Sequence, residues 1–75
     1  MKAWELLEQT GWCQGAMTDQ DGCICAFHAV IQIYGYGSPE ESRLSWLIEG
    51  SISTWNDAPG RTKAEVIAAL KAADV

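Results

Sequence analysis

The most apolar stretch of this chain, ICAFHAVIQIY, runs from residue 24 to residue 34 and is followed by a glycine. Its large apolar side chains recur at the i, i+3, i+4, i+7 spacing of one helical face: Phe27, Val30, Ile31 and Tyr34. Ala26, Ala29 and Ile33 widen that face. Its β-branched residues favour a strand weakly, but its length and spacing favour a helix. We therefore predict a central helix over this stretch, around which the rest of the chain must pack.

The length of the chain, 75 residues, is near the lower limit for a domain with one hydrophobic core. Hydrophobic residues make up 48% of the chain and charged residues 20%, which is typical of a globular domain and not of a disordered segment. Each of four tryptophans can bury about 200 Å² of surface: Trp4, Trp12, Trp46 and Trp55. We interpret them first as core residues, and the alternative is that one or two are exposed for a partner.

Glycines and turn-forming residues divide the chain before the central helix. Residues 2–10, KAWELLEQT, carry apolar side chains at helical spacing, and Gly11 follows as a predicted left-handed cap. Residues 12–22 contain TDQDG, a good tight turn, because Asp side chains bond nearby amides and Gly accepts positive φ. An alternative for residues 13–25 is that QGAM and CICA pair as a short β-hairpin.

Two capping boxes predict helices after the central one. SPEE (residues 38–41) places Ser at the N-cap, Pro at the first helical position and Glu at the third, and Gly50 is expected to end this helix. TKAE (residues 62–65) starts the last helix in the same way. The residues expected to face inward are Leu44, Leu47 and Ile48, then Val66, Ile67 and Leu70. We predict a mainly α fold, a single domain over residues 1–75 in which three or four short helices pack on the central apolar helix.

The charge of the chain limits its partners. Ten acidic and five basic residues give a net charge of −5, which disfavours direct binding to nucleic acid or anionic lipid and allows a basic protein partner. No apolar run approaches the roughly 20 residues of a membrane span, and the first residues lack a signal-peptide pattern. Three cysteines leave at least one unpaired, which fits a reducing compartment. We expect a cytoplasmic protein.

Cysteine chemistry is one alternative function. Cys25, His28 and Gln32 lie at i, i+3, i+7 opposite the apolar face, with Cys25 in the first turn, where the helix dipole lowers a thiol pKa. GCICAFHA has a likeness to CGSCWAF, the nucleophile segment of papain-like proteases, but those enzymes take their base from a distant segment. We favour a buried cysteine beside a His–Gln pair at the helix edge, and a cysteine-dependent enzyme using Cys25 and His28 is the alternative.

Zinc binding is a second alternative. Cys13, Cys23, Cys25 and His28 are the ligand types of a structural zinc site, and so small a domain would gain stability from one. The C-x-C step is unlike the usual C-x₂₋₄-C spacing, so the sequence favours no cofactor, and a zinc-stapled binding domain is the alternative.

The segment WNDAPGR, residues 55–61, precedes the last helix and is too elaborate for a plain linker. Its structural interpretation is a corner in which an Asx turn at Asn56 and Asp57 leads to an extended Ala–Pro step, and Arg61 returns to Asp57 or to a helix end. Its functional interpretation is a partner-binding site with an aromatic anchor and a polar rim. The candidate partner-binding residues are Trp55, Asn56, Asp57 and Arg61.

Three motifs give the chain a resemblance to a known group of proteins: WCQG (residues 12–15), DQDGCIC (residues 19–25) and WNDAPGRTKAEV (residues 55–66). They resemble the W-x-x-G, D-x-x-G-x-x-C and WND-x-PGRT-x-x-EV motifs of an uncharacterised family of small actinobacterial and phage proteins. The middle motif departs from the family, with CAFHA where the family tends to have C-x-x-G-A. The resemblance implies a cytoplasmic protein borne by a phage or mobile element, and it supplies no catalytic residue.

Small size, acidic charge and many tryptophans favour a non-enzymatic protein-interaction factor. Its expected partner is a bacterial protein, with inhibition of a host or defence protein, such as a CRISPR nuclease complex, as the specific form. A homo-oligomer whose exposed tryptophans meet across a two-fold axis is a further alternative.

Overall fold

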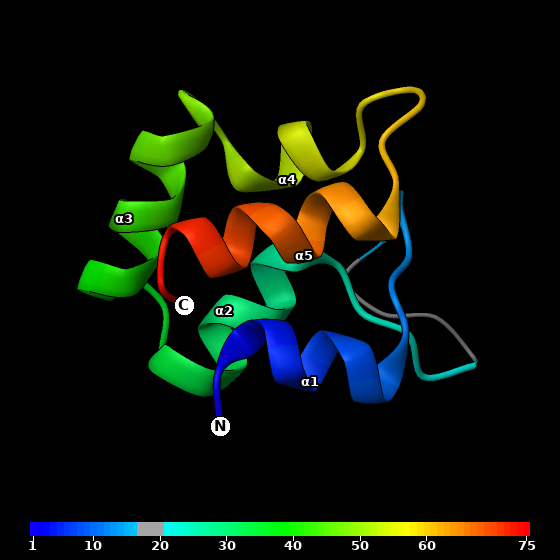
Figure 1. Cartoon of the computed structure of the whole chain (residues 1–75), viewed down its shortest axis with the longest axis horizontal. Helices are drawn as coiled ribbons and strands as arrows, with labels where there is room; N and C mark the ends of the chain where they lie inside the picture. The colour runs from blue at the N-terminus through cyan, green and yellow to red at the C-terminus, as the bar shows by residue number, and fades with distance from the viewer. Residues whose placement is uncertain (17–20) are drawn as a thin grey trace.

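The computed structural model describes residues 1–16 and 21–75, and these residues form five helices (Figure 1). The helices are α1 (Ala3–Thr10), α2 (Ala26–Tyr34), α3 (Pro39–Ile48), α4 (Ile52–Asn56) and α5 (Lys63–Ala72). The predicted mainly α fold is confirmed. No helix in the described part of the chain is long and apolar enough to cross a bilayer.

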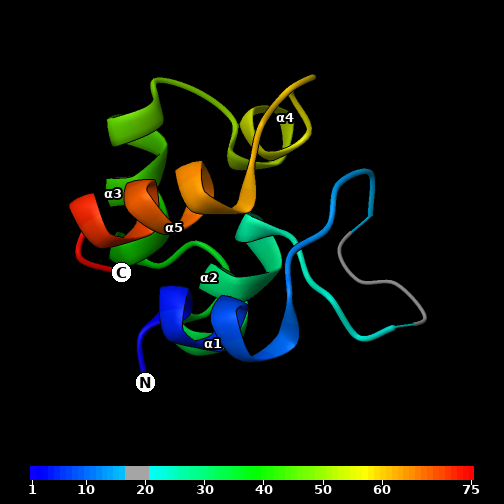
Figure 2. The ribbon, with the colours of Figure 1, turned by 45° about the vertical axis from the view of Figure 1, so that its right-hand side comes forward.

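The helix α2 packs against α1, α3 and α4, while α5 packs against α1 and α3 (Figures 1 and 2). Helices from both halves of the sequence therefore surround one shared interior. The stretch predicted to be the central helix begins two residues later than expected, because Cys25 is the N-cap of α2 and not part of its first turn.

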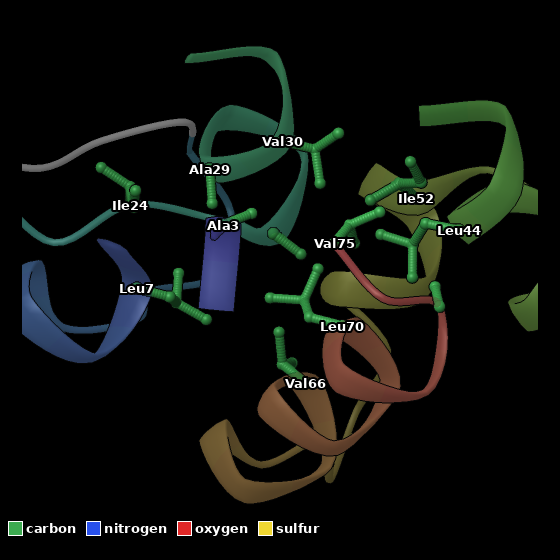
Figure 3. Packing of buried hydrophobic residues seen from close by; sticks show 12 residues of the cluster. Ala3, Leu7, Ile24, Ala29, Val30, Leu44, Ile52, Val66, Leu70 and Val75 are labelled. Carbon is green, nitrogen blue, oxygen red and sulfur yellow. The ribbon is translucent and has the colours of Figure 1, made fainter. Parts of the chain in front are cut away.

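The interior is lined by side chains from all five helices (Figure 3). Its buried aliphatic residues include Leu7, Val30, Leu44, Ile52, Val66, Leu70 and Val75. Burying one such side chain contributes about 1.5–3 kcal/mol to stability. Three of the tryptophans, Trp4, Trp12 and Trp55, are partly buried and pack against this cluster, as the first interpretation of the tryptophans expects. Trp46 does not, because its side chain is 83% exposed.

The buried face of α2 differs from the predicted stripe. Ala26, Ala29 and Val30 are fully buried, whereas Phe27 and Ile31 are only partly buried. The small alanine side chains let α1 approach α2 closely, with its own Ala3 and Leu7 buried. The larger aromatic side chains sit at the edge of the core, where the hydroxyl of Tyr34 donates to the backbone oxygen of Val75 at 2.9 Å.

The N-caps of α3 and α5 are the residues predicted from the sequence, Ser38 and Thr62. In α5 both bonds of the capping box form, from the Glu65 amide to the Thr62 hydroxyl at 3.2 Å and from the Thr62 amide to the Glu65 carboxylate at 3.0 Å. In α3 the Ser38 hydroxyl accepts from the Glu41 amide at 3.2 Å. The reciprocal bond is missing there, because the Ser38 amide donates to the Gly35 oxygen instead.

The predicted glycine caps at the ends of α1 and α3 differ from the structure, one in its conformation and the other in its position. Glu49, with φ of 61° and ψ of 42°, is the left-handed residue that ends α3, so the role expected of Gly50 falls one residue earlier. Gly11 has positive φ of 88°, but its ψ of 162° lies outside the left-handed helical region. This combination of angles is essentially confined to glycine, and it lets the chain leave α1 toward residue 24.

The segments flanking the predicted hairpin meet in a different arrangement. Trp12 and Ile24 form an isolated parallel bridge, with hydrogen bonds from the Cys13 amide to the Ile24 oxygen and from the Ile24 amide to the Gly11 oxygen. A hairpin pairs its strands antiparallel, so this bridge is not part of a hairpin, and the hairpin that is the alternative for residues 13–25 stays only a possibility. Residues 17–20, which include most of the predicted TDQDG turn, lie outside them.

The helix α4 occupies a segment for which the sequence predicts no helix. It has five residues, ISTWN, none of which is a strong helix former. The Ser51 hydroxyl caps it by accepting from the Thr54 amide, and Ile52 and Asn56 are buried at its two ends. Tertiary burial therefore holds this helix, and Asn56 ends a helix where an Asx turn was predicted.

Candidate functional site

Asn56 connects three parts of the chain from a fully buried position. Its Oδ1 accepts from the Trp12 indole Nε1 at 2.6 Å and from the Ala26 amide, at the start of α2, at 2.9 Å. Its Nδ2 donates to the Cys13 oxygen at 3.1 Å and to the Asp57 carboxylate at 3.0 Å. The two acceptor sites and two donor hydrogens of an amide side chain are all used within the chain.

Further hydrogen bonds join the segment around Asn56 to Gln14 and Gly15. The Gln14 side-chain amide donates to the backbone oxygens of Asn56, at 2.9 Å, and of Ala58, at 3.0 Å. The Gly15 amide donates to the Asp57 carboxylate at 2.9 Å, and this bond with that from the Asn56 amide lowers the pKa of Asp57. The WCQG and WND motifs, separated by about forty residues in sequence, are thus hydrogen-bonded to each other.

Of the two predicted returns of Arg61, the structure shows the one to a helix end, at Trp55 of α4 and Glu65 of α5, and not the one to Asp57. Its guanidinium carbon lies 4.1 Å from the Trp55 ring centroid, and its Nε donates to the Trp55 oxygen at 3.0 Å. Its Nη1 pairs with the Glu65 carboxylate at 3.2 Å. The stacked guanidinium holds the corner against the start of α5, and such a contact is worth about 0.5–1 kcal/mol or more.

The structural interpretation of WNDAPGR therefore accounts for its central residues. Asn56 cannot contact a partner because it is fully buried and its amide is fully bonded. Pro59 and Gly60, the latter with φ of 82°, turn the chain, and the Arg61 amide donates to the Ala58 oxygen at 3.1 Å across that turn. Partner binding by Trp55, Asp57 and Arg61, which are exposed or partly exposed, stays a prediction.

Cys25 lies in an environment that disfavours its thiolate. It is buried, and this burial raises its pKa, while hydrogen bonds from the backbone amides of His28 and Phe27 oppose the rise. The expectation of a pKa lowered by the helix dipole is wrong, because the sulfur is desolvated at the N-cap, where it accepts from the His28 amide at 3.3 Å. A small pocket of about 140 Å³, lined also by Gly15 and Asp57, borders Cys25.

We expect iodoacetamide at neutral pH to alkylate Cys25 more slowly than a cysteine in an unstructured peptide, by roughly tenfold or more. Burial restricts access, and the raised pKa reduces the thiolate fraction. Peptide mapping by mass spectrometry at successive times measures the rate at each cysteine, and the protein unfolded in guanidinium chloride is the control. Equal rates for Cys25 in the folded and unfolded protein would contradict this environment.

The predicted zinc ligands do not come together. Within residues 1–16 and 21–75, no group of three or more Cys, His, Asp or Glu side chains is placed to hold a metal ion. Cys25 is buried and caps the start of α2, whereas Cys23 is only partly buried. The zinc-stapled alternative therefore has no assembled site among these residues.

The largest exposed apolar side chains on the helices belong to α3, where Trp46 is 83% and Leu47 is 47% exposed. The prediction that Leu47 faces inward is wrong. Trp46 stands between two hollows, one of about 360 Å³ toward Glu49 and one of about 540 Å³ toward Arg43 and the end of α5. We refer to the outward residues Arg43, Trp46, Leu47, Glu49 and Ala72 as the Trp46 surface.

A signal for this surface is present in the sequence. Trp46, Leu47 and Ile48 are consecutive and apolar, and three successive residues cover about 200° of a helix. A helix that packs on one side cannot bury all three side chains. The core takes Leu44 fully and Ile48 partly, so the other two face outward.

The rim of the Trp46 surface is polar and partly fixed. Arg43 donates from Nε to the Ala73 oxygen at 2.9 Å and from Nη2 to the Asp74 oxygen at 3.1 Å, which joins α3 to the end of α5. The Asp74 carboxylate pairs with Lys2 at 2.9 Å, and this contact lowers the pKa of Asp74. Arg43, on α3, and Glu49, the residue that caps the C-terminal end of α3, lie three residues before and three residues after Trp46.

Comparison with known proteins gives one match. The sequence model of a family described as "Family of unknown function (DUF6197)" matches residues 1–74. No curated protein and no solved structure matches the chain. An uncharacterised family is therefore confirmed, whereas the three motifs and the actinobacterial or phage origin stay predictions.

Proposed function

We propose that this chain, which belongs to the DUF6197 family of unknown function, is a small non-enzymatic factor that acts by binding a protein through its Trp46 surface. The observation that carries the proposal is the exposure of Trp46 beside Leu47 in so small a domain. An aromatic anchor with aliphatic neighbours and a polar rim is the composition of an interface hot spot. Solvent-exposed side chains of this size together on one helix are typical of interaction sites.

The environment of the titratable groups supports a role without catalysis. Cys25, the residue on which the cysteine-enzyme alternative depends, is buried with a raised pKa. The lowered pKa values of Asp57, Glu65 and Asp74 each arise from a structural contact, namely the Gly15 amide, the capping box of α5 and the pair with Lys2. Within residues 1–16 and 21–75, contacts of the fold thus account for these shifted pKa values, which supports a role without acid–base catalysis.

The class of partner follows from charge and from the sequence motifs. A net charge of −5 favours a basic protein surface over nucleic acid or anionic lipid. The resemblance to small actinobacterial and phage proteins supports a partner in a bacterial cytoplasm. In its specific form, the factor comes from a phage or mobile element and inhibits a host or defence protein, as anti-CRISPR proteins do, by covering part of its surface.

We expect Trp46→Ala to weaken partner binding by about thirtyfold, because a hot-spot truncation costs about 2 kcal/mol or more. Affinity capture from a bacterial host lysate, followed by calorimetric titration of the retained protein, measures the effect. Tyr36→Ala is the matched control, because Tyr36 is an aromatic residue as exposed as Trp46, at 84%, and lies outside the Trp46 surface. If the native chain and Trp46→Ala retain the same host proteins, the proposal is contradicted. If only Trp55→Ala loses these proteins, the binding site lies at WNDAPGR instead.

A further inference from the structure

The Trp46 surface is complementary to itself, and we infer that it binds a second copy of this chain in a two-fold dimer with antiparallel α3 helices. The inference rests on the proposed function, since it assigns an occupant to the same surface. It follows from three features of that surface: the order of its charges along α3, the hollow beside the indole, and the area that a dimer needs.

Each copy carries a net charge of −5, so two copies repel at long range, but the charges beside Trp46 are ordered so that antiparallel helices attract there. Arg43 and Glu49 lie three residues on either side of Trp46. A two-fold axis passing beside Trp46 and perpendicular to α3 places Arg43 of each copy opposite Glu49 of the other, so one pairing becomes two by symmetry. A parallel arrangement would place like charges opposite each other.

Arg43 and Glu49 can each form a further hydrogen bond or ion pair with a second copy of the chain. Arg43 has five N–H donors, of which two are used on the backbone oxygens of Ala73 and Asp74, so its guanidinium is held in place with donors remaining. Glu49 is exposed, and its carboxylate has no hydrogen bond or ion pair within the described residues. Because Arg43 is already positioned, most of the side-chain freedom lost on pairing is that of Glu49.

The shape of the surface supplies a projection and a hollow side by side. The indole of Trp46 projects into solvent, and next to it lies the hollow of about 540 Å³, whose lining includes Leu47, the last α5 residue Ala72, and Ala73, which caps α5. An interface between identical copies requires one patch to hold both complementary shapes. The two-fold operation brings each indole over the hollow of the other copy, where aliphatic side chains contact it.

The area that a dimer needs is a small share of the molecular surface. A small specific interface buries about 1,200 Å² in total, or about 600 Å² from each copy. That is roughly one seventh of the 4178 Å² accessible surface of the chain. The dimer covers Trp46, so binding of a second copy and binding of a foreign partner at this surface exclude each other.

Sedimentation equilibrium over a wide range of protein concentration tests the dimer. We expect a reversible monomer–dimer equilibrium for the native chain and a dissociation constant raised at least tenfold by Trp46→Ala and by Glu49→Arg. Glu8→Arg is the matched control, because it makes the same charge change on an exposed residue of α1 outside the Trp46 surface. It should leave the dissociation constant within about twofold.

A mixing experiment identifies the pairing. Arg43→Glu and Glu49→Arg should each be monomeric alone, since each opposes like charges across the axis. Their equimolar mixture should form a heterodimer, because both cross-axis pairs are then of opposite charge. Thermal melting of each variant checks that it is folded, since Arg43 also contacts α5.

The outcomes separate this inference from the proposed function. A native chain that is monomeric throughout, or a dimer that survives both Trp46→Ala and Glu49→Arg, overturns the inference. If a monomeric native chain still loses a captured protein on Trp46→Ala, the proposed function stands and the occupant is foreign. If the dimer depends on Trp46 and no other protein binds there, the inference stands and binding of a bacterial partner fails.

Discussion

Replacing Asn56 by alanine is expected to lower the free energy of unfolding by about 4 kcal/mol, the largest loss from any single side chain that we predict. The substitution leaves the Trp12 indole N–H, the Ala26 amide and the Cys13 oxygen without the partner that each has in the native chain. A polar group left unpaired in the interior costs about 1–3 kcal/mol. A domain of this size has a total stability of about 4–11 kcal/mol, so the variant should be close to unfolding.

Urea denaturation followed by circular dichroism measures this loss. Thr54→Ala is the matched control, because Thr54 lies on the same helix, is exposed, and should change stability by about 0.5 kcal/mol or less. If Asn56→Ala proves unfolded, Trp12→Phe gives a milder test, since it removes only the indole N–H that donates to Asn56 Oδ1. A loss below 1 kcal/mol for Asn56→Ala would mean that these hydrogen bonds do not hold the segments together.

Leu44→Ala is expected to cost about 3 kcal/mol, whereas Leu47→Ala on the same helix should change stability by about 0.5 kcal/mol or less. Leu44 is fully buried, and its truncation removes apolar contacts and leaves a cavity. Leu47 is 47% exposed, so water already covers much of its side chain. Both variants make the same Leu→Ala change on the same helix, so the difference between their losses of stability measures the effect of burial. Equal losses in urea denaturation would mean that α3 presents a different face to the core.

The features predicted correctly from sequence are those set by neighbouring residues. The capping box of Thr62 and Glu65 forms in full, because its two partners are three residues apart and need nothing else. The helical periodicity of residues 24–34 gives α2 for the same reason. The short α4 was missed because its residues have low helix propensity and its stability comes from burial against distant segments.

The candidate site shows where local reasoning fails. The sequence singled out both WCQG and WNDAPGR, but nothing in either motif states that Asn56 is bonded to Trp12 and Cys13. An Asn before an Asp is more often a turn residue, and only tertiary contact shows it as a buried connector. Likewise, which of the consecutive apolar residues Trp46, Leu47 and Ile48 faces the core depends on the rotation of α3 about its axis relative to the neighbouring helices. Periodicity alone therefore placed Leu47 inward, while the packed helix turns it out beside Trp46.

We propose that Trp46 is turned outward for contact with another protein molecule. Oxidative footprinting of the tryptophans tests it directly, read once in dilute protein and once in concentrated protein or in a captured complex. We predict that Trp46 is oxidised faster than Trp4, Trp12 and Trp55 in the dilute sample and is selectively protected in the associated one. A Trp46 oxidation rate that matches the other three, or that is the same in both samples, would contradict the claim.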